Sequence, residues 1–166
     1  MQDELLEIVD EKGNVIGLAP RSRLHGDPSL MHRVVHVMVF NRKGELLLQL
    51  RSKKKDVAPG KWDTSAGGHV SPGEEVLDAA KRELKEELGI SLEPEFLYSY
   101  THTNPYETEL VYTFSCAYDG GFPFDKEEID GIRFWGMDEL GANMGSGLLS
   151  DNFEHELKVY LSAPPQ

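Results

Sequence analysis

The sequence predicts an α/β fold in which helices pack on a mixed β-sheet as a sandwich. Two observations lead to this prediction. Strand-like segments come both before and after one central helix, and an amphipathic helix closes the chain. At 166 residues the chain is long enough to bury a substantial core, and we expect residues 1–166 to form a single domain.

Apolar runs bounded by turn residues predict the strands. The first two flank a turn at residues 11–14, which predicts an N-terminal β-hairpin. In chain order the expected strands are residues 5–9, 15–19, 32–41, 45–51, 62–66, 96–103, 109–118 and 132–137. Beyond the central helix we expect a helical turn at 138–140 and a C-terminal helix at 151–161. Residues 21–30 and the basic segment 52–61 are expected to be connections without regular structure.

The central helix follows a loop rich in glycine and proline. Glu74 and Glu75 are expected in its first turn, where the helix dipole favours anions. Gly89 is expected to close it at the C′ position, where glycine accepts a positive φ. At about 100° per residue the apolar side chains share one stripe that must face a core. The residues of this stripe are Leu77, Ala80, Leu84 and Leu88.

Glu83, Glu86 and Glu87 fall together on an adjacent face of the same helix. Like charges three or four residues apart destabilise a helix by roughly 0.2–0.5 kcal/mol per pair. Grouped carboxylates suit Mg²⁺, which typically binds one or two of them together with substrate phosphates. The other interpretation is a solvated acidic face. The glycine-rich loop favours the metal site, because glycine lets backbone groups approach an ion or a phosphate.

The segment from Gly68 to Ile90 resembles the Nudix box, GX5EX7REUXEEXGU with U aliphatic, at every specified position. The matching residues are Gly68, Glu74, Arg82, Glu83, Leu84, Glu86, Glu87, Gly89 and Ile90. The resemblance implies a Nudix-type α/β/α sandwich. It also implies hydrolysis of a nucleoside diphosphate linked to another group, assisted by Mg²⁺ or Mn²⁺. The implied metal ligands are Glu83, Glu86, Glu87 and the carbonyl of Gly67, with Arg82 orienting the glutamates.

Most of the chain before residue 140 is also similar to the isopentenyl-diphosphate isomerases, a branch of the same superfamily. That branch has a histidine pair ahead of the first core strand, a W-x-x-x-x-C-G-H segment and an E-x-E pair on a later strand. Three histidines and two glutamates hold a metal there, and such ligands suit Zn²⁺, Mn²⁺ or Mg²⁺. The matching residues, which the resemblance implies as ligands of a second divalent metal, are His25, His32, His69, Glu107 and Glu109.

The chain departs from the isomerases at Gly67, which stands where they carry their catalytic cysteine. The single thiol, Cys116, falls on the apolar side of an expected strand and is interpreted as core packing. Because the box is intact and the cysteine is absent, hydrolysis is favoured over isomerisation. An isopentenyl-diphosphate isomerase and a non-catalytic nucleotide-sensing module remain as alternative functions.

The group that activates water is open between Glu83 and an acidic loop that holds Glu127 and Glu128. For that loop a solvated charge run is an equal interpretation. Lysines in or beside the basic segment could meet substrate phosphates, although a solvated loop is favoured for Lys53, Lys54, Lys55 and Lys61. His36 is expected on the same strand face as His32. Packing is favoured over base stacking for Trp62, Tyr106 and Trp135.

Composition limits the partners. The formal net charge of −12 argues against a nucleic-acid polymer and leaves a small diphosphate bridged by metal ions. One cysteine fits a reducing compartment, and the sequence shows neither a signal peptide nor a membrane span, so a cytoplasmic location is expected. The hairpin offers an edge strand that could pair with a second copy, so a homodimer is considered.

Overall fold

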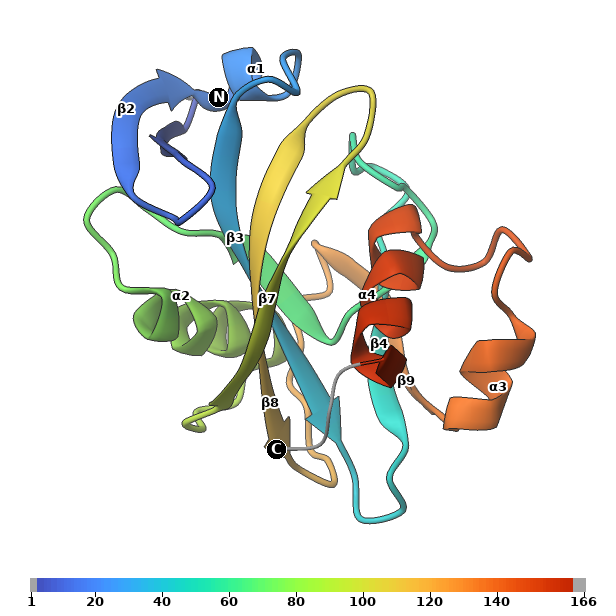
Figure 1. The fold of residues 1–166 in the computed structure, drawn as a ribbon. Helices are drawn as coiled ribbons and strands as arrows, with labels where there is room; N and C mark the ends of the chain where they lie inside the picture. The colour runs from blue at the N-terminus through green and yellow to red at the C-terminus, as the bar shows by residue number, and fades with distance from the viewer. Residues whose placement is uncertain (1–2, 163–166) are drawn as a thin grey trace.

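The computed structural model describes residues 3–162, and the fold is a mixed β-sheet with helices on both faces (Figure 1). Its strands are β1 (Leu5–Val9), β2 (Val15–Pro20), β3 (Met31–Phe40), β4 (Leu46–Arg51), β5 (Trp62–Asp63), β6 (Ala66–His69), β7 (Glu95–Thr103), β8 (Thr108–Ala117) and β9 (Ile129–Trp135). Its helices are α1 (Arg21–Leu24), α2 (Val76–Glu83), the π-helix η1 (Leu84–Leu88), α3 (Met137–Ala142) and α4 (Asp151–Ser162). The predicted α/β class and the N-terminal hairpin are confirmed.

Strand β3 organises the sheet. Along one edge it pairs antiparallel with β1, then β6, then β4, and along its other edge it pairs in parallel with β8 over its whole length. Strand β7 continues the sheet beyond β8, and β9 continues it beyond β4, both antiparallel. One parallel pair among antiparallel pairs makes the sheet mixed, as predicted.

The two faces of β3 bury different material, because successive side chains of a strand point to opposite faces. Val35, Val37 and Val39 pack in one core cluster with the apolar stripe of α2 and η1. Met38, on the other face, packs in a second cluster with Phe153 of α4. Figure 1 shows α2 and α4 on opposite sides of the strands. Because β3 is covered on both faces, its polar side chains lie between the sheet and the elements that cover it, where they can line a site.

The central helix differs from the prediction in where it begins and in the type of its last turn. It begins at Val76, with Glu75 as the N-cap residue, so the prediction that Glu74 and Glu75 lie in its first turn is wrong. Glu74 instead remains in the preceding turn, where its carboxylate accepts a bond from the Ser71 N–H at 3.0 Å. The last turn is a π-helix, which widens the spacing of its residues. Gly89 closes it with φ of 73°, as predicted.

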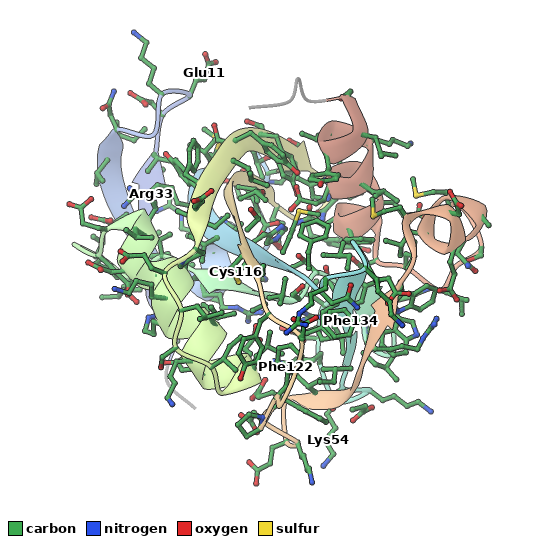
Figure 2. The ribbon with its side chains drawn as sticks, turned by 90° about the horizontal axis from the view of Figure 1, so that it is seen from below. Glu11, Arg33, Lys54, Cys116, Phe122 and Phe134 are labelled. Atoms are coloured by element: carbon green, nitrogen blue, oxygen red, sulfur yellow. The ribbon has the colours of Figure 1, made fainter. Side chains whose placement is uncertain are left out.

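The apolar stripe of this helix faces the core as predicted. Ala80, Leu84 and Leu88 are completely buried, and Leu77 packs beside them. Phe122 and Phe134 pack against the same cluster, with ring centroids 6.0 Å apart (Figure 2). In the same view the side chains of Glu11 and Lys54 project outward from the surface.

Three other expectations need correction. The strand expected at 62–66 is two short strands, β5 and β6, which pair with different partners. The connection at 21–30 begins with helix α1. Tyr106 is 69% exposed rather than packed, whereas Trp135 is buried as expected.

In the described part of the chain, no helix has the length and apolar character of a membrane span.

Candidate active site

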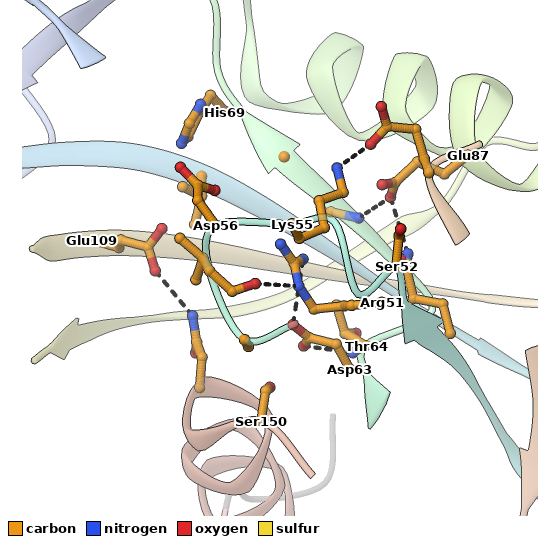
Figure 3. A pocket seen from close by; sticks show the side chains of 18 of the residues that line it. Arg51, Ser52, Lys55, Asp56, Asp63, Thr64, His69, Glu87, Glu109 and Ser150 are labelled. Atoms are coloured by element: carbon orange, nitrogen blue, oxygen red, sulfur yellow. Dashed lines mark hydrogen bonds and ion pairs between the residues drawn. The ribbon is translucent and has the colours of Figure 1, made fainter. Parts of the chain in front are cut away.

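A cavity of about 1360 Å³ opens on the face of β3 that does not contact α2. Figure 3 shows Glu109 and His69 toward one end of it and Glu87 toward the other, with Asp63 and Thr64 between them and Ser150 at the start of α4. The lining therefore comes from the sheet, which includes Gly67 and Gly68 in β6 rather than in the loop expected for them, from the basic segment, from the acidic segment before β9 and from the C-terminal helix.

The register of the sheet places the polar side chains of this cavity. His32 lies opposite Glu109 in the parallel β3–β8 pair, and His69 lies opposite Val34 in the antiparallel β3–β6 pair. Cross-strand neighbours share a face, and so do residues two apart on a strand. His32 and His36 are therefore on one face with Glu109 and His69. The structure thus brings the candidate ligands together on one side of the sheet.

The histidine–glutamate cluster is compact. One ligand atom from each of His25, His32 and His69 lies within 4.8 Å of the other two, and His32 forms a similar group with Glu107 and Glu109. His25 Nε2 lies 3.5 Å from Glu107 Oε2, and His32 Nε2 lies 3.7 Å from Glu109 Oε2. These distances are too long for good hydrogen bonds but leave space for an ion between the atoms.

The protonation of the cluster fits the same interpretation. Burial, reinforced by the nearby His69 and His25, lowers the pKa of His32 to about 3, so its imidazole stays neutral. Burial beside Glu107 raises the pKa of Glu109 well above its usual range. Neither ring nitrogen of His32 has a hydrogen-bond partner among the described residues. Unpaired buried nitrogens are costly, and neutral imidazoles next to carboxylates are what a divalent cation binds.

A second group of carboxylates lies at the other end of the cavity. Glu87 Oε1 accepts hydrogen bonds from the Gly67 N–H at 2.8 Å and from the Gln49 amide at 3.2 Å. Burial, with a smaller contribution from the charge of Glu83, raises the pKa of Glu87 to about 8. Burial also raises the pKa of Glu83. A cation would lower both values, because it favours the ionised carboxylates.

Arg82 ties the glutamates to the preceding loop. Its guanidinium donates to both carboxylate oxygens of Glu74 at 2.9 and 3.0 Å, to Glu83 at 2.6 Å, to Glu86 at 3.3 Å and to the carbonyl of His69 at 2.9 Å. A planar guanidinium with all its N–H groups engaged fixes orientation as well as charge. The Glu74 carboxylate is thereby linked to two of the glutamates on the following helix.

Two glycines allow the helix to approach the sheet. Gly68 faces the helix, and a Cβ atom there would overlap the carboxylate of Glu83. Gly67 faces the cavity, and a Cβ atom there would lie 2.9 Å from the Val35 carbonyl oxygen and 3.0 Å from a ring carbon of His36. Neither position has space for a larger residue without movement of its neighbours.

The sequence matches the model of the NUDIX domain over residues 30–155. This chain belongs to the Nudix family. It is 36% identical over 143 residues to an uncharacterized Nudix hydrolase of Yersinia pestis, covering 84% of this chain and 76% of that protein. It is 37% identical over 145 residues to an isopentenyl-diphosphate Delta-isomerase of Streptomyces avermitilis, covering 82% and 73%.

Solved structures agree with the Nudix fold. The structure of DR0079 from Deinococcus radiodurans aligns with a TM-score of 0.77 and 26% identity, covering 93% of this chain and 98% of that one. A MutT protein of Methanosarcina mazei aligns with a TM-score of 0.67 at 22% identity, which concerns the fold alone. The predicted Nudix-type sandwich is therefore confirmed.

The Nudix-box glutamates do not all reach the cavity. Glu87 lines it, Glu83 is largely buried against Arg82 and Gly68, and the Glu86 side chain is 58% exposed. Glu127 lines the rim of the cavity. Glu128 also lines it and forms an ion pair with Lys55.

The basic segment is divided. Lys54 and Lys55 line the cavity, whereas Lys53 does not, and the Lys61 ammonium donates to the carbonyl of Gly147. Cys116 packs partly buried against the first core cluster, and burial raises the pKa of its thiol to about 11. The thiol is therefore an inert core side chain, as predicted.

Several residues of the site gave no sequence signal. These are Gln49, Arg51, Asp63, His102 and Asn152. Glu156, which bonds to His36 behind the cavity, did have a sequence signal, because it interrupts the apolar stripe of the C-terminal helix, three residues after Phe153 and next to Leu157. A charged residue at such a position is either paired or functional.

Proposed function

We propose that this Nudix protein hydrolyses a pyrophosphate bond of a small diphosphate, with Mg²⁺ or Mn²⁺ held by the Nudix-box glutamates. The observation that carries the proposal is the Glu87 carboxylate, which is buried at the cavity and hydrogen-bonded only to Gly67 and Gln49 among the described residues. A buried carboxylate without a basic partner is stabilised by a cation.

Glu83, Glu86, Glu87 and the Gly67 carbonyl would hold that metal. A metal bound there would neutralise the pyrophosphate and lower the pKa of an attacking water. Arg82 keeps Glu83 and Glu86 in place, and the Gly67 N–H orients Glu87. The proton of the water would pass to Glu83 or to Glu127, whose loop is joined to Glu87 by the bond from the Asp125 N–H to the Glu87 carbonyl at 3.0 Å.

A second divalent metal at the histidine–glutamate cluster belongs to the same proposal. The unpaired nitrogens of His25 and His32 support it, because a ligand would satisfy them. Glu4 already binds His69 Nδ1 at 2.9 Å, which leaves the other ring nitrogen of His69 for the metal. This metal would lie at the end of the cavity away from Glu87 and would help to hold the substrate.

Isomerisation of isopentenyl diphosphate is the second candidate function. The five-residue cluster and the isomerase of Streptomyces avermitilis favour it. Gly67 argues against it, since this position carries no thiol and has no room for a Cβ atom. The one cysteine, Cys116, packs in the core instead of lining the cavity.

The test is hydrolysis of a panel of diphosphates with Mg²⁺ or Mn²⁺, measured as phosphate release from terminal diphosphates and as monophosphate products from diphosphates that link two groups, with isopentenyl diphosphate also analysed for its isomer. Metal-dependent cleavage of at least one member is expected. Glu86→Gln and Glu87→Gln should each lower the rate by about 10²-fold, whereas Glu93→Gln, at an exposed carboxylate after the helix, should not. Unchanged hydrolysis in both box variants would contradict the proposal, and tight ligand binding without turnover would point to a sensing module.

A further inference from the structure

The lining of the cavity has few large apolar side chains. Among the described residues that line it, none is phenylalanine, tyrosine or tryptophan, and the only larger aliphatic side chains are Val34 and Val57. The rest are charged or polar side chains, with glycines and one alanine. A ligand that entered this space would meet many hydrogen-bonding groups but no ring of phenylalanine, tyrosine or tryptophan.

This lining is a poor match for two kinds of diphosphate. An isoprenoid chain gains binding free energy only when its CH₂ groups are buried against an apolar wall. A nucleobase gains binding free energy from stacking on an aromatic side chain. The guanidinium groups of the lining do not replace that platform. Arg21 is paired with Asp56 at 3.1 Å, and Arg51 donates to the Val57 carbonyl at 2.8 Å.

The wall formed by β3, β7 and α4 offers fixed polar groups instead. His36 Nδ1 lies 3.0 Å from Glu156 Oε1, and Glu156 is completely buried. Glu156 also accepts from the hydroxyls of Tyr98 at 2.6 Å and Thr113 at 3.1 Å. With Glu156 bound to Nδ1, His36 has its other ring nitrogen for the cavity that it lines.

A second histidine on this wall is also held by one nitrogen. His102 Nδ1 bonds to His155 Nδ1 at 2.9 Å, while His102 Nε2 is buried without a hydrogen-bond partner, 3.6 Å from Asp151 Oδ2. Asn152 lies beside them and donates to Glu109 at 3.0 Å. An unpaired buried nitrogen is destabilising, and a hydrogen bond from a ligand hydroxyl would remove that cost.

We propose that the group attached to the diphosphate is a small sugar or polyol, with its hydroxyls bound by His36, His102, Asp151 and Asn152. A hydroxyl both donates and accepts, so it suits a wall that mixes carboxylates with imidazole and amide groups. The inference rests on the proposed hydrolysis and adds the class of substrate. It assigns this wall to recognition and the Nudix-box end of the cavity to the diphosphate.

Three matched diphosphates test it, because each can release phosphate by the same cleavage. Ribose 5-diphosphate carries a five-carbon polyol, isopentenyl diphosphate carries five carbons without hydroxyls, and adenosine 5′-diphosphate carries the same ribose with a base. With Mg²⁺, kcat/KM for ribose 5-diphosphate should exceed that for isopentenyl diphosphate by about 10²-fold or more, because missing hydroxyls leave site groups unpaired. It should exceed that for the nucleotide by about tenfold, because the base finds no platform.

The outcomes separate the two proposals. Phosphate release with isopentenyl diphosphate or the nucleotide as the better substrate would overturn the inference and leave the hydrolase intact. No release from these three or from the wider panel would overturn both.

Variants locate the recognition. Asp151→Ala should reduce the preference for ribose 5-diphosphate over isopentenyl diphosphate by about tenfold. The Asp151 side chain is 70% exposed, so the variant is expected to fold. The control is Asp138→Ala, an exposed first-turn aspartate of α3 outside the cavity, which should leave the preference unchanged. His36→Phe should lower the same ratio, with its melting temperature measured alongside. An unchanged ratio in both Asp151→Ala and His36→Phe would contradict this placement.

Discussion

Gly67 and Gly68 are adjacent, and the missing side chain of each avoids a different steric clash. Gly68 makes room for the Glu83 carboxylate on the helix side of β6, while Gly67 makes room for His36 on the cavity side and gives its N–H to Glu87. Alternation along the strand separates the two tasks. The Nudix-box pattern identified Gly68 from sequence, but only the register of β6 against β3 shows why a side chain is excluded at both positions.

Replacing Gly68 by alanine should displace Glu83 and break its bond to Arg82. We expect hydrolysis to fall by about 10–100-fold, since misplacement of metal ligands or of their supports has effects of this size. The measurement is kcat/KM with Mg²⁺ together with the melting temperature. Gly141→Ala is the matched control, because a Cβ atom there meets nothing within 4 Å. Equal activity of the two variants would show that Glu83 tolerates the movement.

At the scale of elements, the motif helix was predictable in its stripe and its end but not in its last turn. A period of 3.6 residues correctly assigned Leu84 and Leu88 to the core. It could not reveal the π-helix, because a turn that contains an extra residue departs from the 3.6-residue period on which the prediction rests. Similarly, apolar runs located β5 and β6 approximately, yet not their separation, which depends on two different partner strands.

Helix α4 is attached to the sheet by a buried carboxylate as well as by apolar contacts. Glu156→Leu would leave the donors of Tyr98, Thr113 and His36 without their acceptor. We expect the free energy of unfolding to fall by about 2–4 kcal/mol, because buried unpaired donors are costly. Chemical denaturation measures this change.

Two further variants show how much of that loss of stability comes from the missing acceptor. Glu156→Gln keeps an acceptor and should lose less than Glu156→Leu. Glu154→Leu, which replaces a partly exposed acceptor of the Gly145 N–H, should lose about 1 kcal/mol or less. If Glu156→Leu were as stable as the native protein, the buried network would contribute nothing to the attachment of α4.

At the scale of the whole molecule, two buried groups set opposite pH limits on the metal-free protein. The pKa of Glu87 rises from 4.5 to about 8 on folding, so the folded state binds the extra proton and stability falls as pH rises between these values. The pKa of His32 falls from 6.5 to about 3, so stability falls as pH drops below 6.5. The two trends oppose each other between pH 4.5 and 6.5.

The combined effect of Glu87 and His32 should keep the melting temperature of the metal-free protein nearly constant from pH 4.5 to 6.5. From pH 6.5 to 8 we expect the melting temperature to decline. Mn²⁺ binds the ionised carboxylate and should remove the decline, so the ion should stabilise more at pH 8 than at pH 5.5. Scanning calorimetry at matched ionic strength checks this, because a net charge of −12 also responds to salt. Glu87→Gln should show a smaller alkaline decline without metal, while Glu83 and Glu109, whose pKa values are also raised on folding, continue to contribute to it.

The candidate site as a whole was predictable only in the part that follows a local pattern. The box residues and the histidine–glutamate set stand in short segments at fixed spacing, so the sequence identified them as candidates. His102, Asn152 and Glu156 come from segments separated by about fifty residues, and only the packing of α4 on β7 brings them to the cavity. Such contacts leave no periodic trace in one sequence.

The pairing of β3 also bears on how this protein can change over generations. Strand β3 fixes the positions of residues at both ends of the cavity, because it pairs with β1, β6 and β8. A one-residue shift in the register of β3 would turn His32 and His36 to the opposite face together. Changes of length are therefore confined to the rim, where residues 52–61 and the acidic turn before β9 lie on the surface. New substrates would be acquired by remodelling these segments, while the frame that positions the candidate metal ligands stays unaltered.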